Sequence, residues 1–308
     1  MTTLLLTHEA CLAHDTGRHH PESPARLRAV LDGLAGPAFA SLDRRDAPVA
    51  LPDDIARAHT DEFVATMLAA IPASGHAAID ADTIISAGSG EAALRAAGAV
   101  VAGIDAVIAG EAVNAFCAIR PPGHHAERAH AMGFCVFNNV AVGAHYARAA
   151  HGVERVAAID FDVHHGNGTQ DIFWSDRNLF YASTHQSPLY PGTGARGETG
   201  VGNIVNVPLR PGAGSEEFRA AMTALILPAL ESFGPDLILI SAGFDAHRSD
   251  PLAGLEFVEA DYAWVTQQLV DLAARHCNGR IVSSLEGGYD LTALAQSAAA
   301  HVGALMGR

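Results

Sequence analysis

Short apolar runs alternate along this chain with longer amphipathic segments, as they do in repeated strand–helix–strand units. The predicted strands cover residues 3–7, 114–119, 155–159, 179–183, 204–207, 237–241 and 281–285. The predicted helices between them cover residues 24–34, 91–109, 138–150, 215–233 and 259–275. Runs such as 237–240 are apolar at every position, which indicates strands that are buried on both faces. The pattern therefore predicts a parallel sheet with helices on each side.

Chemically active side chains gather directly after four of the predicted strands. The segments concerned are 120–125 (RPPGHH), 160–168 (DFDVHHGNG), 242–247 (AGFDAH) and 286–289 (EGGY). In open parallel sheets, ligands bind beyond the carboxyl ends of the strands. Because a chance scatter of polar residues would not select the same end of four strands, we expect the functional site at this edge of the sheet.

The stretch that follows residue 159 carries the strongest indication of a metal site. Side chains at i, i+2 and i+4 of an extended strand share one face, so Asp160, Asp162 and His164 are expected to point the same way. Two carboxylates and an imidazole suit Zn²⁺, and a site with three protein ligands keeps a position open for water. Asp245 is the best third ligand beside Asp162 and His164, and His247 is its competitor. The alternative is that these acidic and glycine residues only close a strand-to-helix turn.

Three further side chains, His124, His125 and Tyr289, supply what hydrolysis at such a metal requires. A histidine pair suits acid–base catalysis near neutral pH, with one ring accepting a proton from the attacking water while the other steadies charge or protonates the leaving group. Tyr289 stands in a Gly-Gly-Tyr turn, where its phenol together with a metal would polarise a carbonyl and stabilise an oxyanion. The predicted reaction is amide hydrolysis. The competing interpretation treats the histidines as surface residues and the tyrosine as a packing residue.

Composition indicates which partners and which cellular compartment we expect for this protein. The formal net charge of −15 argues against nucleic acid or an anionic membrane as a partner and favours cationic substrates. All 19 basic residues are arginine, so the chain offers no lysine amine for Schiff-base catalysis. The four cysteines form no CxxC pair, and no apolar stretch approaches about 18 uninterrupted residues. We expect a soluble, cytoplasmic protein with a single catalytic domain over residues 1–308, whose oligomeric state the sequence leaves open.

Seven motifs spread over the chain together resemble the histone deacetylase superfamily, closest to its class II and bacterial amidohydrolase members. They are His20 to Arg26 (HPESPAR), Arg120 to His125, Gly133 to Cys135 (GFC), Asp160 to Gly168, Pro191 to Gly194 (PGTG), Gly243 to Asp245 (GFD) and Leu285 to Tyr289 (LEGGY). The resemblance implies a three-layer α/β fold of the arginase/deacetylase type, with a central, mostly parallel sheet of about eight strands and helices on both faces. It also implies the removal of an acetyl or other acyl group from an amine, usually a lysine side chain.

The same resemblance assigns the metals. The family's ligands match Asp162, His164 and Asp245, which implies one catalytic Zn²⁺, or Fe²⁺ in its place. The family also binds structural K⁺ near the strand that carries the metal ligands. The groups that match its K⁺ ligands are the side chains of Asp160, Asp162 and Ser183 and the backbone carbonyls of His164 and Thr184.

The resemblance also assigns catalytic roles. His124 and His125 match the acid–base pair, and Tyr289 matches the phenol that stabilises the oxyanion. Asp160 matches the carboxylate that orients His124. Asn167 stands where class I enzymes carry an aspartate, and as in class II it would support His125 with less charge.

A narrow acyl-lysine tunnel is implied by a further set of matches. Gly133 and Phe134 correspond to one wall, and Tyr190 corresponds to the facing wall, where phenylalanine is usual. This difference leaves the acyl-chain preference open. Arg26 matches an internal arginine on the side where product leaves. At the mouth, Leu252 follows an Asp-Pro pair, where enzymes that act on polyamines tend to place an acidic residue.

Three other functions fit parts of this pattern. An acetylpolyamine amidohydrolase shares the fold, the metal and the reaction, and the acidic charge suits its substrates equally well, although Leu252 weighs against it. An arginase-like ureohydrolase would need a second aspartate two residues after Asp245, and His247 stands there. A non-catalytic acyl-lysine binding protein is expected to lack Tyr289 or one of the paired histidines, and all three are present. The favoured substrate is therefore an acyl-lysine peptide or protein, or a small acylated amine.

Overall fold

The structure of the protein, a computed structural model, describes residues 2–308. Its strands are β1 (Thr3–Thr7), β2 (Asp43–Asp46), β3 (His76–Ala78), β4 (Ile84–Ser86), β5 (Asn114–Cys117), β6 (Val156–Asp160), β7 (Leu179–Gln186), β8 (Ile204–Leu209), β9 (Leu237–Ala242) and β10 (Ile281–Leu285). Its α-helices are α1 (Pro24–Gly33), α2 (Pro52–Ile55), α3 (Asp61–Ala69), α4 (Ser89–Ala109), α5 (Asn139–His151), α6 (Asn167–Phe173), α7 (Ser215–Ala221), α8 (Leu227–Phe233), α9 (Glu259–His276) and α10 (Leu291–Leu305). Two short 3-10 helices, η1 (Glu9–Leu12) and η2 (Pro37–Phe39), and a π-helical segment, η3 (Met222–Ile226), complete the described elements.

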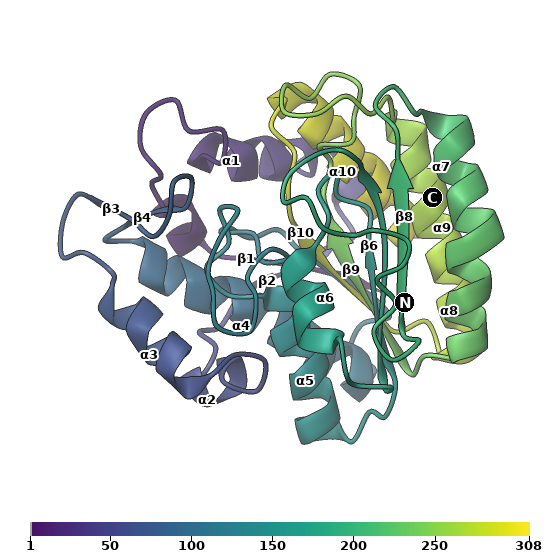
Figure 1. Ribbon diagram of the computed structural model, residues 1–308, viewed down its shortest axis with the longest axis horizontal. Coiled ribbons are helices and arrows are strands. Elements are labelled where there is room, and N and C mark those ends of the chain that lie inside the picture. The colour runs from purple at the N-terminus through teal and green to yellow at the C-terminus, as the bar shows by residue number, and fades with distance from the viewer. Residues whose placement is uncertain (1) are drawn as a thin grey trace.

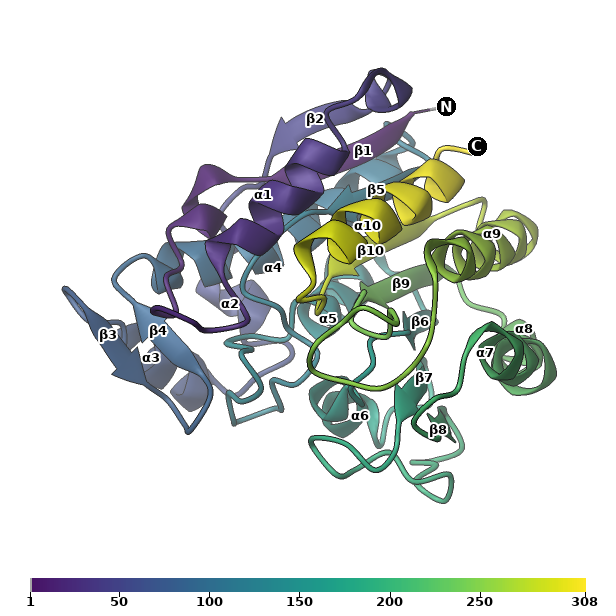
Figure 2. The same cartoon turned by 90° about the horizontal axis from the view of Figure 1, so that it is seen from above.

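Eight of the strands form one parallel sheet in the order β2-β1-β5-β10-β9-β6-β7-β8. Helices α1, α10 and α9 lie along one face of this sheet, and α4 and α5 lie along the other (Figure 2). Central strands such as β9 are buried at every position, because both of their faces meet helices. Strands β3 and β4 form a separate antiparallel hairpin that projects from one end of the molecule (Figure 1). These layers confirm the predicted α/β fold.

The four strands that precede the predicted site lie side by side at the centre of the sheet. They are β5, β10, β9 and β6, in that order. Their register places Cys117, Ser284, Ser241 and Asp160 in one row across the sheet. Because the strands are parallel and end near this row, the loops that follow them start at the same level. The loops therefore meet over one edge of the sheet.

Several elements depart from the predicted pattern, which contains no counterpart of β3, β4, α2, α3 or α6. The sequence pattern does not predict β2, because its four residues are all charged and it pairs only with β1 at the edge of the sheet, where burial is not required. It does not predict α10 either. The predicted helix 215–233 is interrupted by the π-helical segment η3, directly before the turn that contains Pro228. Proline lacks the N–H that an α-helix needs at this point, so the backbone hydrogen bonds shift locally.

Helix α4 is the one helix of residues 2–308 that is long and apolar enough to span a membrane, judged by length and composition alone. It packs against β5, β10 and β1 and against α5. Of its most apolar stretch, 61% is buried inside the protein. The apolar character of α4 is therefore explained by its place in the core.

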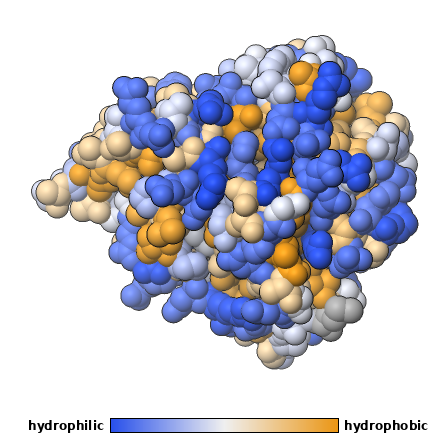
Figure 3. Space-filling model, turned by 90° about the horizontal axis from the view of Figure 1, so that it is seen from below, coloured by the Kyte–Doolittle hydropathy of each residue, from blue (hydrophilic) through white to orange (hydrophobic). Residues whose placement is uncertain are grey.

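Exposed apolar side chains are dispersed over the surface. On the face that Figure 3 shows, hydrophobic residues form separate patches among hydrophilic ones. Two of the large exposed apolar residues, Tyr190 and Leu252, belong to the mouth of the cavity described below. Scattered apolar residues of this kind are normal on a folded protein and need no partner to explain them.

A buried histidine connects α10 to the sheet and makes the stability of the fold sensitive to acid. The ring of His301 lies with Nδ1 2.6 Å from Oγ1 of Thr266 and with Nε2 2.8 Å from Oγ of Ser283. The Thr266 hydroxyl already donates to the carbonyl of Tyr262, so it accepts from Nδ1–H, and Nε2 accepts from Ser283. Burial lowers the pKa of His301 to about 3. The folded protein therefore holds this imidazole neutral.

We expect His301 to destabilise the fold as the pH falls from about 6.5 toward about 3. Its folded-state pKa lies below its unfolded value, so the unfolded chain binds more protons in this window. The free energy of unfolding should then fall by up to about 1.4 kcal/mol per pH unit on account of this group. Urea denaturation at pH 7 and pH 5 should show a smaller loss for His301→Gln than for the wild type. Parallel pH dependences in the two proteins would contradict this assignment.

Candidate active site

Three metal-ligating side chains converge beyond the carboxyl ends of β6 and β9. Asp162 and His164 come from the loop after β6, and Asp245 comes from the loop after β9. One donor atom of each lies within 4.8 Å of the others. Nδ1 of His164 lies 3.1 Å from Oδ1 of Asp162 and 3.1 Å from Oδ2 of Asp245. The structure thus brings together the three predicted ligands, from two neighbouring strands.

The second oxygens of the two carboxylates are held by backbone N–H groups. Oδ2 of Asp162 accepts from the N–H of Gly287 (2.8 Å), and Oδ1 of Asp245 accepts from the N–H of Val163 (2.8 Å). A Cβ at Gly287 would overlap Oδ2 of Asp245 and Oδ2 of Asp162, so this close approach requires glycine. These contacts fix the orientation of both carboxylates before any ion binds.

The electrostatics of this cluster favour a cation at its centre. Burial lowers the pKa of His164, but hydrogen bonds to Asp162 and Asp245 and their charges outweigh it and raise that pKa to about 10. Burial, and then the charge of Asp162, raise the pKa of Asp245 to about 7. Two buried carboxylates so close together need a positive charge, which a proton supplies in the absence of a metal. The donor set therefore fits a divalent cation, which would take the place of that proton.

His247, the competing third ligand, lies outside this cluster. Its Nδ1 accepts from the N–H of Ser249 (3.1 Å), and its Nε2 lies 3.5 Å from Glu259. Both ring nitrogens are thus directed toward the following loop and α9. The three-donor cluster found in residues 2–308 contains Asp245 instead.

The paired histidines lie beside the metal ligands, each held by a partner on its Nδ1. Nδ1 of His124 lies 3.0 Å from Oδ2 of Asp160, and Nδ1 of His125 lies 2.8 Å from Oδ1 of Asn167. The two rings are in contact, with centroids 4.0 Å apart. Nε2 of His124 is 3.8 Å from Oδ2 of Asp162. Because Nδ1 of each ring has its own partner, each Nε2 is free to face the metal side.

The environments of the two histidines push their pKa values apart. Burial lowers the pKa of His124, but the carboxylates of Asp162 and Asp160 outweigh it and raise that pKa to about 10. Burial and the neighbouring His124 and His164 rings hold the pKa of His125 well below its usual value. Opposite shifts of this kind mark one group that carries a proton and one that can accept it.

Asn167 determines which nitrogen of His125 is protonated. Its Nδ2 donates to Oε1 of Glu127 (2.7 Å), so its Oδ1 is the atom that faces His125 and accepts from Nδ1–H. Nε2 of His125 is therefore left with a lone pair. A neutral amide supports this arrangement without adding negative charge beside the ring.

A narrow cavity of about 240 Å³ leads to these groups. Its lining includes the four residues predicted to bind substrate, Gly133, Phe134, Tyr190 and Leu252, together with Tyr289, His124, His125 and His164. The Phe134 and Tyr289 rings meet edge to face at 6.0 Å, and the Tyr190 ring meets His125 at 5.1 Å. Aromatic and apolar walls around a polar end suit an aliphatic chain that carries a polar reacting group.

Gly133 lets the wall of the cavity approach His125. Its φ is +58°, and a Cβ there would lie 2.5 Å from Cδ2 of His125. We expect Gly133→Ala to displace that ring and to lower kcat by at least about tenfold. Gly110→Ala is the matched control, since Gly110 has φ +74° but nothing within 4 Å of the added Cβ. Steady-state kinetics should show normal kcat in the control; equal losses in both variants would point to backbone strain alone.

A buried ion-pair network lies behind Tyr289. Oε1 of Glu22 accepts from Nη1 of Arg26 (3.0 Å), Oε2 accepts from Nη2 of Arg120 (2.6 Å), and Nε2 of His14 lies 3.3 Å from the same Oε2. Burial opposes ionisation of Glu22, but Arg120 and His14 outweigh it and hold its pKa well below the usual value. The Arg26 guanidinium lies over the Tyr289 ring, 4.9 Å from its centroid.

The sequence motifs assign no role to Glu22, Arg120 or Glu286, although the structure places all three at the site and fully buries them. The available signal was a charged residue inside each proline- or glycine-rich motif. A charge in such a motif is not needed for the turn itself and therefore indicates a buried partner.

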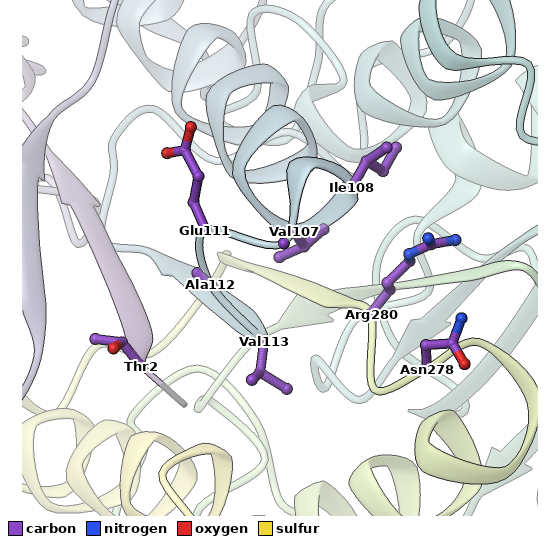
Figure 4. A pocket seen from close by; sticks show the side chains of 9 residues that line it. Thr2, Val107, Ile108, Glu111, Ala112, Val113, Asn278 and Arg280 are labelled. Atoms are coloured by element: carbon purple, nitrogen blue, oxygen red, sulfur yellow. The ribbon is translucent and has the colours of Figure 1, made fainter.

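A second pocket lies at the other end of the strands and has different chemistry. Figure 4 shows its lining, which comes from the end of α4 and from residues just before β1, β5 and β10. Glu111 is its one carboxylate, and it pairs with Arg45 (2.7 Å). The lining contains neither histidine nor cysteine. The described residues of this pocket therefore offer no metal-ligating set.

Comparisons with known proteins agree with this geometry. Residues 20–305 match the model of the histone deacetylase domain. The chain is 42% identical over 308 residues to a histone deacetylase-like amidohydrolase of Pseudomonas aeruginosa, covering 91% of this chain and 80% of that protein. It is 39% identical over 298 residues to a probable deacetylase of Archaeoglobus fulgidus, covering 94% and 82%. The crystal structure of the HDA15 HD domain superposes with a TM-score of 0.95 at 37% identity, covering 100% of this chain and 88% of that one.

The fold, the site and these relatives define a hydrolase that acts on amides. The chain belongs to the histone deacetylase family, as its sequence motifs predicted.

Proposed function

We propose that this protein removes acetyl or other acyl groups from lysine side chains of peptides or proteins, with a divalent metal ion held by Asp162, His164 and Asp245. The observation that supports this most strongly is the convergence of three ligands beside a narrow apolar cavity. The cavity is lined by aromatic and apolar side chains, which suit an aliphatic chain, and it ends at groups that can activate water and bind an oxyanion.

The metal has a limited and specific part in this proposal. When bound, Zn²⁺ would act as a Lewis acid on the substrate carbonyl and lower the pKa of water. Two carboxylates and one imidazole suit Zn²⁺, and Fe²⁺ is the other candidate. The remaining contributions come from side chains of the chain itself.

His125 is the proposed base, because Asn167 holds its Nδ1 protonated and leaves the Nε2 lone pair facing the cavity. The hydroxyl of Tyr289 donates a hydrogen bond to the substrate's carbonyl oxygen as negative charge develops there. His124 carries a proton that Asp160 and Asp162 stabilise, and it donates that proton to the departing amine. Cleavage of the amide then yields a carboxylic acid and a free lysine amine.

The decisive test compares turnover of an acetyl-lysine peptide with turnover of N-acetylputrescine by the Zn²⁺-loaded protein. We expect the peptide to be hydrolysed and N-acetylputrescine to be a poor substrate, since Leu252 lines the cavity where an acidic residue would attract the second amine. Preference for N-acetylputrescine would move the function to polyamine deacetylation. Tight binding of the peptide without turnover would point to an acyl-lysine binding protein.

Two features of the chain would also suit a polyamine substrate. Asp82 also lines the cavity, and the formal net charge of −15 favours cationic molecules in general. Leu252→Glu would add an acidic group at the same mouth. Improved turnover of N-acetylputrescine by this variant, with reduced turnover of the peptide, would show that Leu252 selects between the two.

Three further expectations belong to the same proposal. Asp160 and Ser183 are buried register neighbours on β6 and β7, as a structural K⁺ site there would need. All four cysteines are free and buried, which suits a reducing, cytoplasmic setting. The motifs of the site extend from Glu22 to Tyr289, so residues 1–308 would act as one catalytic domain.

A further inference from the structure

Glu286 is a fully buried carboxylate that the proposed reaction does not use. We propose that Glu286 is a positioning residue. It holds the turn that carries His124 against the loop that carries Tyr289, and so fixes the distance between the paired histidines and the Tyr289 phenol. This inference rests on the proposed function, because it concerns the same reaction.

The histidine turn is attached to one oxygen of Glu286. Oε2 accepts from the backbone N–H of Gly123 (2.7 Å) and from that of His124 (3.1 Å). The other oxygen, Oε1, accepts from the hydroxyl of Ser241 (3.2 Å). Since Glu286 is fully buried, water cannot replace it as an acceptor for these groups.

The sequence of the turn makes this attachment necessary. Pro121 and Pro122 have no backbone N–H, so Gly123 and His124 provide the backbone donors of the stretch 121–124. Both donate to Oε2 of Glu286. The path from the end of β5 to His124 is therefore fixed at its histidine end by this carboxylate.

The backbone of Glu286 begins the loop that ends at Tyr289. Its carbonyl accepts from the buried Arg26, and the next N–H, that of Gly287, donates to Oδ2 of Asp162 (2.8 Å). One residue thus contacts the histidine turn through its side chain while its backbone is anchored beside a metal ligand. A shift of Glu286 would change the positions of His124 and Tyr289 relative to each other.

Two substitutions of Glu286 distinguish the effect of its reach to the histidine turn from the effect of its negative charge. Glu286→Gln keeps the reach, because its carbonyl oxygen can accept both N–H groups while its amide donates to Ser241. Glu286→Asp keeps the charge but is one methylene too short to reach the turn. We expect Gln to retain kcat within about threefold and Asp to lower kcat by at least about tenfold, with KM changed by less than about threefold in both.

Ser241→Ala is the matched control, because it removes the bond to Oε1 and leaves both bonds to Oε2. We expect its kcat to stay within about threefold of the wild type. A loss as large as that of Glu286→Asp would overturn the proposal. So would an active Asp variant beside an inactive Gln variant, since charge would then matter more than reach, and so would a loss confined to KM. If Glu286→Asp fails to fold, a tenfold loss in Glu286→Gln still decides against the proposal.

Failure of the proposed function would look different from failure of this inference. A wild-type protein that hydrolyses neither acyl-lysine peptides nor acylated amines contradicts the proposed function. The positioning role of Glu286 can still be tested, because the position of His124 can be measured directly. Crystal structures of the Gln and Asp variants then provide the readout. We expect His124 to be displaced in the Asp variant and unmoved in the Gln variant; an unmoved His124 in both would overturn the inference.

Discussion

Replacing Tyr289 by phenylalanine should lower kcat by about 10²-fold to 10³-fold and change KM by less than about threefold. Tyr289 lines the cavity beside the paired histidines, where its hydroxyl can donate to the oxygen that gains charge during amide cleavage. Burial raises its pKa well above the usual value, so the hydroxyl keeps its proton at neutral and alkaline pH. The interaction strengthens as the oxyanion forms, which is why the loss should appear in kcat.

Phenylalanine at this position retains the other contacts of Tyr289. The ring still packs against Phe134 and under Arg26, and the backbone N–H still donates to Asp250 (2.7 Å). Tyr190→Phe is the matched control, since it removes the hydroxyl of the other tyrosine in the cavity. Steady-state kinetics should show kcat of the control within about threefold of the wild type. A Tyr289→Phe variant as active as this control would exclude the phenol from catalysis.

The sequence predicted the centre of the fold because burial on both faces leaves a clear pattern. Strands such as β9 are apolar throughout, and their carboxyl ends had to meet in a parallel sheet. The parallel sheet also explains why the site could be located. The segments that carry chemically active side chains follow β5, β6, β9 and β10, which are neighbours in the sheet. The edge strand β2 lacked this apolar pattern, because a strand at the exposed edge of a sheet can consist of charged residues.

The alternation of side chains along β6 explains the position of Asp160 but not those of Asp162 and His164. Strand β6 ends at Asp160, so period-two geometry does not carry Asp162 and His164 to the site. The loop is held instead by side chains that accept from the backbone two residues on: Asp160 accepts from the N–H of Asp162 (3.1 Å), and Asp162 accepts from the N–H of His164 (2.9 Å). The spacing of the acidic residues therefore matters because of these turns.

The supporting residues could not be assigned from the sequence because their partners are distant along the chain. Glu286 bonds Gly123, 163 positions away, and Glu22 bonds Arg120, 98 positions away. Local patterns show that a charge is unusual in its motif, but they do not show which buried donor it meets. Only the assembled sheet brings these pairs together.

Removing the metal should abolish turnover without unfolding the protein. Once the ion is chelated, His164 takes up a proton, because Asp162 and Asp245 raise its pKa to about 10. The imidazolium then compensates the two buried carboxylates, so we expect circular dichroism to remain close to that of the loaded protein. Activity should fall below about 1% and return on addition of Zn²⁺. Asp245→Asn should bind Zn²⁺ poorly, whereas His247→Gln should keep both metal and activity; the reverse result would make His247 the third ligand.

Rebinding of Zn²⁺ should weaken as the pH falls, and the slope should change near neutrality. Zn²⁺ must displace the His164 proton at any pH below about 10, so its affinity should drop about tenfold per pH unit. The pKa of Asp245 is raised to about 7, so below that pH a second proton competes and the slope should approach about a hundredfold per unit. Titration of the chelated protein with buffered Zn²⁺ between pH 6 and pH 8.5 measures this directly. An affinity independent of pH would mean that the ion binds without displacing either proton, and therefore at other ligands.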